Sequence, residues 1–334
     1  MPIEAELKTI DGESAASLVH SICCLAGQPS YIADIRSDLR QAGVLKAIAA
    51  HDSQTIFNWL TVALSFQGIS DAVARNYIDT HGSVTWQDIA DRLQRRPDCS
   101  KLTSYWHFVD CGYRKSTYTC AAPDFIAACP LPDHRLRNGN LNQLAYSLFF
   151  FIRDIAEGDL VGWIDAALAR PAVDNEDDRV ERSRNALLDP MRQVFGVSDK
   201  VLAMALSMLL LGSNKPSWMQ VGATMIAVDT LVHNFLHRTG ILQRVGAAHR
   251  YGTACYQEHG CADVIRVISK AIDARQFNRR FPRNFPRFIQ GAIWRYCAQG
   301  GLNVCNGNKI DDSRPCEQRS CRVYGRCCRI PLAS

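Results

Sequence analysis

Runs of apolar residues separated by short polar turns dominate the chain and predict an all-α protein. The longest runs cover residues 144–152 and 201–211. Both are shorter than the roughly 20 residues that span a bilayer, so we expect buried helices. The first 50 residues predict further short amphipathic or buried helices.

A polar turn follows the apolar helix that begins at Gln54. Ser70 and Asp71 can cap the next helix, which Gly82 would end. Gln67 is therefore expected at a junction between two helices. From the pattern alone, it is most simply a polar side chain satisfied by its neighbours.

Residues 179–212 predict a helix, a tight turn and a second helix. Pro190 is expected to kink or interrupt the first helix, and Gly212 to end the second. Such a hairpin presents backbone N–H groups and a positive helix N-terminus to an anion, which suits a DNA phosphate. Lys200 opens the second helix and Asp229 ends the next apolar run. Polar groups at the edges of core segments are candidates for a catalytic pair.

The stretch between residues 83 and 140 predicts one short helix and then a loop or insertion rich in cysteine and aromatic residues. Cys111, Cys120 and Cys129 follow no regular metal-ligand spacing. A metal site in this stretch is a weaker alternative than one at the C-terminus.

Composition and charge narrow the class of protein. With 47% hydrophobic and 21% charged residues, the chain can bury a sizeable core, which we expect in two lobes. Residues 270–334 hold thirteen Lys and Arg against four Asp and Glu, a net charge of +9, whereas the rest of the chain carries −4. A basic C-terminal part suits a partner with phosphates. The first ten residues lack a signal-peptide pattern, so we expect a cytoplasmic protein with no membrane partner.

Cysteine is abundant, with fourteen residues, and six of them lie in the last forty positions. In a cytoplasmic protein this density favours a metal site over disulfides. His233 and His237 are four residues apart, a spacing that can bind metal, and His249 follows. Because no carboxylate partner is evident, ordinary core or surface histidines are the preferred interpretation.

Four segments together resemble a known family. In chain order they are Leu64-Ser65-Phe66-Gln67, Phe195-Gly196-Val197-Ser198-Asp199-Lys200, Val228-Asp229-Thr230-Leu231-Val232, and Gly301-Leu302-Asn303-Val304-Cys305 with the cysteines after it. Their sequence and order resemble the helix-hairpin-helix DNA glycosylases, and among them the endonuclease III branch with an iron–sulfur cluster.

The resemblance implies a two-lobe all-α fold. Residues 52–228 would form a six-helix barrel that carries the hairpin at 179–212. Residues 1–51 would pack with a C-terminal lobe, 229–334, which carries a cluster loop at 305–328. The pocket would lie between the lobes, with Lys200 on one side and Asp229 on the other.

The resemblance also implies residue roles. Lys200 would attack the sugar as a Schiff-base nucleophile, and Asp229 would stabilise the positive charge that develops on it. Gln67 would fill the gap left by the extruded base, and further DNA contacts would come from Gly196, Val197, Ser198 and Arg238. The implied protein is a monomeric DNA glycosylase with AP lyase activity, acting on double-stranded DNA that contains a damaged or modified base.

The implied cofactor is a [4Fe–4S] cluster held by Cys305, Cys316, Cys321 and Cys327, with Cys328 as an alternative fourth ligand. Four thiolates can also hold zinc. The cluster loop would press its arginines against the DNA backbone.

The chain also departs from the family pattern. Ser198 replaces the second hairpin glycine, Asn234 replaces an arginine, and the spacer between Lys200 and Asp229 is longer. The cysteine spacing C-x10-C-x4-C-x5-C matches the family only in its last gap. Val62 stands where the adenine-removing branch keeps a glutamate, which counts against adenine opposite 8-oxoguanine as substrate. These departures leave two alternatives, a monofunctional glycosylase and a non-catalytic DNA-binding protein on the same scaffold.

Overall fold

The computed structural model shows a helical protein whose chain divides into two compact units. One unit joins Met1–Ile35 to Asn214–Ser334, and the other is Arg36–Ser213. Helix α3 (Tyr31–Gln41) carries the chain from one unit to the other. The structure describes residues 10–332 except 67–70, 96, 115, 118, 122–128, 135, 138 and 170–174.

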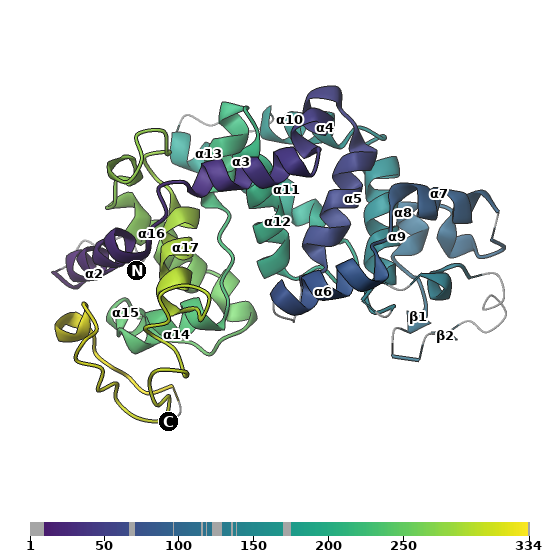
Figure 1. The fold of residues 1–334 in the computed structure, drawn as a ribbon. Helices are drawn as coiled ribbons and strands as arrows, with labels where there is room; N and C mark the ends of the chain where they lie inside the picture. Colours follow the sequence, from purple (N-terminus) through teal and green to yellow (C-terminus); the bar gives the residue numbers. More distant parts are fainter. Residues whose placement is uncertain are drawn as a thin grey trace. The chain divides into compact units, whose positions relative to one another are not determined.

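The unit Arg36–Ser213 is built around α5 (Ser53–Leu64), which packs against four other helices of the unit. Asp52 caps α5 because its carboxylate accepts hydrogen bonds from the backbone N–H groups of Gln54 and Thr55, both at 3.1 Å. The packing partners of α5 are α4 (Val44–Ala50), α7 (Trp86–Gln94), α9 (Asn142–Phe150) and α12 (Asp199–Gly212), as Figure 1 shows.

The other elements of this unit surround that core. They are α6 (Asp71–His81), η1 (Ser100–Leu102), α8 (Tyr105–Phe108), β1 (Tyr113–Arg114), β2 (Thr119–Cys120), η3 (Leu131–Asp133), α10 (Leu160–Ala169) and α11 (Glu176–Met191). β1 and β2 pair antiparallel with Tyr113 opposite Cys120, and they are the only strands among the described residues.

The two long apolar runs form helices, and the structure differs from the prediction at one place. The run at 201–211 lies in α12 and is buried along most of its length, as predicted. The run at 144–152, expected to form one helix, is instead divided between α9 and a π-helical turn, η4 (Phe151–Ile155). The π turn allows the carboxylate of Asp154 to accept a hydrogen bond from the backbone N–H of Tyr105 at 2.6 Å.

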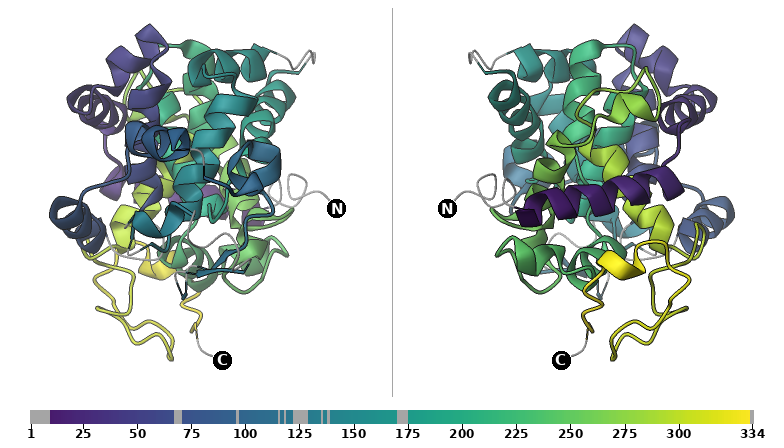
Figure 2. Two further views of the ribbon diagram at one scale, coloured as in Figure 1. Left: turned by 90° about the vertical axis from the view of Figure 1, so that its right-hand side faces the viewer. Right: turned by 90° about the vertical axis from the view of Figure 1, so that its left-hand side faces the viewer.

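The unit Met1–Ile35 with Asn214–Ser334 is centred on α17 (Pro286–Cys297). Figure 2 shows α2 (Ile10–Ala26) running across this unit, where it contacts α15, α16 and α17. The other elements of the unit are α13 (Pro216–Thr224), α14 (Thr230–Arg238), α15 (Ile241–Arg244), η5 (Thr253–Tyr256), α16 (Cys261–Lys270), η6 (Ala274–Gln276) and η7 (Tyr324–Arg326).

Two features of this unit bear on the candidate site. α13 packs on α17, so residues 216–224 belong to the unit that holds the C-terminal cysteines. After α17 the chain has little regular structure apart from η7 (Figure 1). Within the described part of the chain, each helix is too short or too polar to cross a membrane.

Candidate functional site

Helix α14 anchors the candidate site. Asp229 is its N-cap, and one carboxylate oxygen accepts a hydrogen bond from the backbone N–H of Val232 at 3.0 Å. The segment before it is held by Tyr256, whose hydroxyl donates to the carbonyl of Val228 and accepts from its N–H, at 3.0 and 2.8 Å. The half-buried carboxylate of Asp229 therefore has a fixed position.

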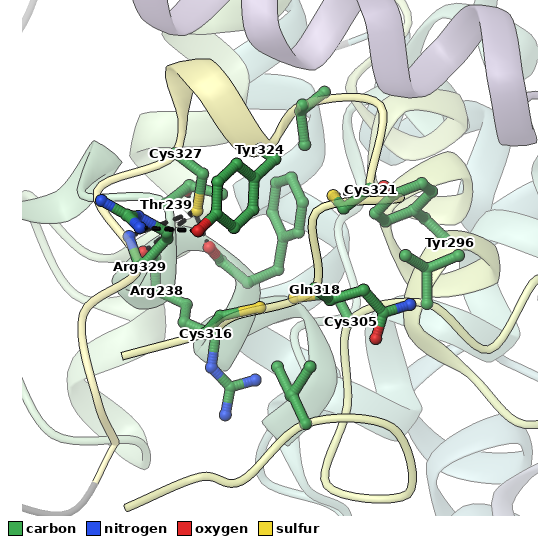
Figure 3. A pocket seen from close by; sticks show the side chains of 14 residues that line it. Arg238, Thr239, Tyr296, Cys305, Cys316, Gln318, Cys321, Tyr324, Cys327 and Arg329 are labelled. Atoms are coloured by element: carbon green, nitrogen blue, oxygen red, sulfur yellow. Dashed lines mark hydrogen bonds between the residues drawn. The ribbon is translucent and has the colours of Figure 1, made fainter. Parts of the chain in front are cut away.

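Four cysteines of the C-terminal segment line one cavity beside the end of α14. They are the residues predicted to hold a metal cluster, Cys305, Cys316, Cys321 and Cys327 (Figure 3). Apolar side chains, among them Phe235 and Val323, form much of the remaining wall. Cys328 does not line this cavity. Its sulfur accepts a hydrogen bond from the guanidinium of Arg244 at 3.2 Å.

Backbone hydrogen bonds attach the cysteine segment to α14. The N–H of Ile330 donates to the carbonyl of Arg238 at 3.0 Å, and the N–H of Cys328 donates to the carbonyl of Thr239 at 3.3 Å. These carbonyls lie at the C-terminal end of α14, where the helix itself supplies no donors. The free carbonyl groups at the end of α14 thus accept hydrogen bonds from N–H groups of the loop. These hydrogen bonds fix Cys327 at the cavity.

Hydrogen bonds also reach the cysteine sulfurs. The Tyr296 hydroxyl lies 3.0 Å from Sγ of Cys321, and the backbone N–H of Arg329 donates to Sγ of Cys327 at 3.3 Å. Burial raises the pKa of Cys327 to about 11, and the nearby thiols of Cys305, Cys321 and Cys316 add to this effect. The four sulfurs are therefore close enough to interact electrostatically.

Cys305 differs from Cys327 because it has a cationic neighbour. A hydrogen bond from Cys297 lowers the pKa of Cys305 to about 7, and Arg238 contributes both charge and a hydrogen bond. Arg238 is only 2% exposed and forms an ion pair with Asp312. In this structure its guanidinium faces the cavity, whereas the sequence pattern predicts a DNA contact for it. Cys297 is fully buried in α17, as expected for a packing residue.

A second group of sulfur and nitrogen ligands lies in the same unit. His233, His249, Cys255 and Cys261 each offer one ligand atom, and all four atoms lie within 4.8 Å of one another. Nδ1 of His233 is 3.3 Å from Sγ of Cys261 and 3.6 Å from Sγ of Cys255. Nε2 of His249 is 3.3 Å from Sγ of Cys261. We call these four residues the Cys–His group, and they can bind a metal ion.

A hydrogen bond joins the two thiols of the Cys–His group and shifts their pKa values in opposite directions. A hydrogen bond from Cys261 lowers the pKa of Cys255 to about 4, against the effect of burial and with help from His233. The same hydrogen bond, together with burial, raises the pKa of Cys261. One thiolate therefore forms readily beside two imidazoles.

The sequence pattern did not reveal the Cys–His group. It favoured ordinary roles for His233, His237 and His249, since no carboxylate partner was apparent. The neighbours of His233 and His249 are thiols from a later part of the chain, which the spacing of the histidines did not indicate. His237 is directed elsewhere, with Nε2 3.2 Å from the carbonyl oxygen of Pro331. The missed signal was the pair Cys255 and Cys261, six residues apart, after the two histidines.

We expect Gly260→Ala to destabilise the protein by about 1–3 kcal/mol. A Cβ at Gly260 would lie 2.2 Å from the carbonyl oxygen of Ala254 and 2.7 Å from the backbone of Cys255, so the turn η5 would have to move. Urea unfolding followed by circular dichroism measures the change. Gly300→Ala is the matched control, because nothing lies within 4 Å of its Cβ position. Equal stability of both variants would contradict close packing at Gly260.

The hairpin predicted to bind phosphate lies in the other unit. Residues 192–198 connect α11 to α12, and Gly196 has a φ of 69°, which favours glycine. Val197 is half-buried and Ser198, the N-cap of α12, is exposed. Pro190 does not interrupt α11, which ends one residue later at Met191. The turn is therefore a sharp reversal between two helices.

Lys200 lies in the first turn of α12 and is half-exposed. Its neighbour Asp199 is paired with Arg192, whose Nε lies 2.6 Å from the carboxylate, and Arg192 also binds Asp189 at 2.5 Å. The guanidinium of Arg192 thus forms ion pairs with two carboxylates at the hairpin, those of Asp189 and Asp199.

The two residues predicted to form the catalytic pair belong to different units. Lys200 belongs to the unit Arg36–Ser213, and Asp229 belongs to the other. Gln67 lies outside the described residues. No protein-family model, curated protein or solved structure matches this chain.

Proposed function

We propose that this protein is a DNA glycosylase with AP lyase activity that carries a [4Fe–4S] cluster. The observation that carries the proposal is the convergence of Cys305, Cys316, Cys321 and Cys327 on one cavity next to α14, the helix that Asp229 caps. In the resembled family, the cluster loop and the catalytic aspartate belong to the same lobe. The order of the four motifs along the chain supports the same proposal.

The cavity residues fit an iron–sulfur cluster. Four thiols are the ligands that such a cluster takes, and the surrounding wall is largely apolar. The Tyr296 hydroxyl and the N–H of Arg329 lie within hydrogen-bond distance of two of the sulfurs, and such hydrogen bonds orient the ligands at metal–thiolate sites. Cys305, Cys316, Cys321 and Cys327 would hold the cluster, whose role would be to fix a loop that has little regular structure of its own.

The loop would also supply cations for a DNA backbone. Arg314, Arg319 and Arg322 are exposed, and the side chain of Arg314 keeps 81% of its accessible surface. Arg326 is used within the protein, where it donates to the hydroxyls of Ser17 and Ser21 on α2. Arg329 donates to the Tyr324 hydroxyl. Phosphate contacts are therefore expected from the first three arginines.

In the proposed reaction, an extruded nucleotide exposes its anomeric carbon. The unprotonated amine of Lys200 attacks this carbon while the bond to the base breaks and the base leaves with a proton. The carboxylate of Asp229 stabilises the positive charge that develops on the sugar. Ring opening gives a Schiff base on Lys200, and elimination of the 3′ phosphate then cleaves the strand. Gln67 and the hairpin at Gly196, Val197 and Ser198 would hold the opened duplex.

A panel of duplexes, each with one modified base, tests the function. Incubation with excess protein should release one or a few of these bases and cleave the strand after release. Base release without strand cleavage would indicate a monofunctional glycosylase. Tight duplex binding without release of any base in the panel would favour the non-catalytic DNA-binding alternative.

Asp229→Asn should slow base release by a factor of about 10²–10⁴ while the fold stays intact. Asparagine caps a helix about as well as aspartate, so the hydrogen bond to the N–H of Val232 persists and only the charge is lost. Asp229→Ala should also lower the free energy of unfolding by about 1 kcal/mol. Single-turnover kinetics and thermal unfolding measure the two effects. Full base release by Asp229→Asn would remove Asp229 from the mechanism.

A further inference from the structure

The Cys–His group has ligand types and spacings that suit a single metal ion. Zn–S bonds of about 2.3 Å and Zn–N bonds of about 2.0–2.1 Å place neighbouring sulfur and nitrogen ligands of a tetrahedral ion about 3.6 Å apart. Three of the four sulfur–nitrogen pairs in the group lie 3.3, 3.6 and 3.3 Å apart. These distances are compatible with sulfur and nitrogen ligands around one small ion, and all four ligand atoms lie within 4.8 Å of one another.

The orientation of His249 adds independent support. Its Nδ1 lies 2.6 Å from the carbonyl oxygen of Ala247 and can only donate to it. This hydrogen bond places the proton on Nδ1 and leaves the lone pair of Nε2 facing Cys261. Metal-bound histidines are commonly oriented by such a second hydrogen bond to a backbone carbonyl.

The segment between α14 and α16 holds the ligands in place. His233 comes from α14, Cys255 from the short turn η5, and Cys261 from the first position of α16. Gly260 allows the start of α16 to approach η5 so closely that a Cβ would contact the backbone of Ala254 and Cys255. Residues far apart in the sequence thus meet through a turn that has few regular hydrogen bonds of its own.

Burial excludes a reactive thiol as the main role of the group. Cys255 and Cys261 are both 0% exposed and His233 is 5% exposed, so a substrate does not reach the sulfurs. Two buried thiolates without a cation would be costly, whereas a divalent cation with two thiolates and two neutral imidazoles leaves no net charge. Four protein ligands and no open position are typical of a structural site.

We propose that His233, His249, Cys255 and Cys261 bind one structural Zn²⁺ ion that ties α14 to η5 and α16. The mixed set of two sulfur and two nitrogen ligands favours zinc over harder cations. The site shares no ligand with the cavity of Cys305, Cys316, Cys321 and Cys327 and does not depend on the proposed enzymatic activity. Its role is to fix the segment that follows the catalytic helix α14.

Zinc and iron analysis of the purified full-length protein by mass spectrometry tests the site. Cys261→Ser and His249→Ala should each lower the zinc content by one ion per chain relative to the wild type, with the iron content unchanged. His237→Ala is the matched control, because His237 lies on the same helix as His233 but contacts Pro331. It should keep the wild-type zinc content. Zinc contents equal to the wild type in Cys261→Ser and His249→Ala would overturn the site.

A second measurement avoids variants that fail to fold. Exchange of zinc for Co²⁺ in the wild-type protein should give the visible absorption of a tetrahedral ion and the near-ultraviolet charge-transfer bands of cobalt–thiolate bonds. His249→Cys should retain the ion and strengthen the charge-transfer bands, because it adds a third thiolate. A Cys255–Cys261 disulfide in the native protein, found by peptide mass analysis, would overturn the proposal. Loss of iron instead of zinc in Cys261→Ser would overturn the assignment to zinc.

Discussion

Lys200→Ala should abolish the covalent adduct that borohydride forms between the protein and abasic-site DNA. Reduction traps the Schiff base between the amine and the sugar, and no adduct forms without the amine. Strand cleavage should fall by a factor on the order of 10³ or more, since removal of a nucleophile costs at least this much. Gel separation of the protein–DNA adduct measures the loss.

Lys200→Arg separates the nucleophile from a phosphate contact. Arginine keeps the positive charge in the first turn of α12 but is not a nucleophile near neutral pH. We expect this variant to bind abasic-site DNA with nearly wild-type affinity and to form no adduct. Lys46→Ala is the matched control, because Lys46 is an exposed lysine of the same unit, on α4. An adduct with Lys200→Ala at the wild-type level would assign the nucleophile to another amine.

The sequence predicted the elements whose signal is local. The apolar runs of α9 and α12 are long and uninterrupted, and this local pattern of apolar residues is enough to predict both helices. The π turn of η4 was missed because the apolar run continues through it unchanged. What differs there is the tertiary hydrogen bond from Tyr105 to Asp154, which no local pattern shows.

The Cys–His group illustrates the same limit at a site. His233 and Cys261 are 28 positions apart, and their approach depends on the contact of Gly260 with the turn η5. The spacing of the histidines does not predict this contact, and the spacing of the cysteines does not predict it either. In contrast, the C-terminal cysteines were dense enough to indicate a metal site before their arrangement was known.

Arg238 shows how burial changes the interpretation of a charged residue. The resemblance to the DNA glycosylases implies a DNA contact for Arg238, which follows the motif that contains Asp229. In the structure it is almost fully buried between Asp312 and Cys305. A buried cation beside thiols can offset the negative charge of a thiolate-bound cluster, and this role is consistent with its place in the cavity wall.

Cys327 and Cys328 offer a sharp test of the cluster, because these adjacent cysteines differ in position. Sγ of Cys327 accepts a hydrogen bond from the N–H of Arg329 at the cavity, whereas Sγ of Cys328 contacts Arg244 and lies outside the cavity wall. We expect Cys327→Ser to lose most of its iron and inorganic sulfide after anaerobic purification. Cys328→Ser should keep wild-type amounts, because it removes no ligand.

The loss of the cluster should also weaken DNA binding. The cluster would hold the loop that carries Arg314, Arg319 and Arg322 in place through its four cysteine ligands. Without the cluster the loop loses this support, because it has little regular structure of its own. We expect Cys327→Ser to bind duplex DNA at least about tenfold more weakly than Cys328→Ser, a difference of about 1.4 kcal/mol. Fluorescence anisotropy at constant salt measures the two affinities. Two zinc ions per chain and no iron in the wild type would replace the iron–sulfur cluster with a zinc site, because the Cys–His group accounts for only one zinc ion. Equal iron in both variants would remove Cys327 from the ligand set.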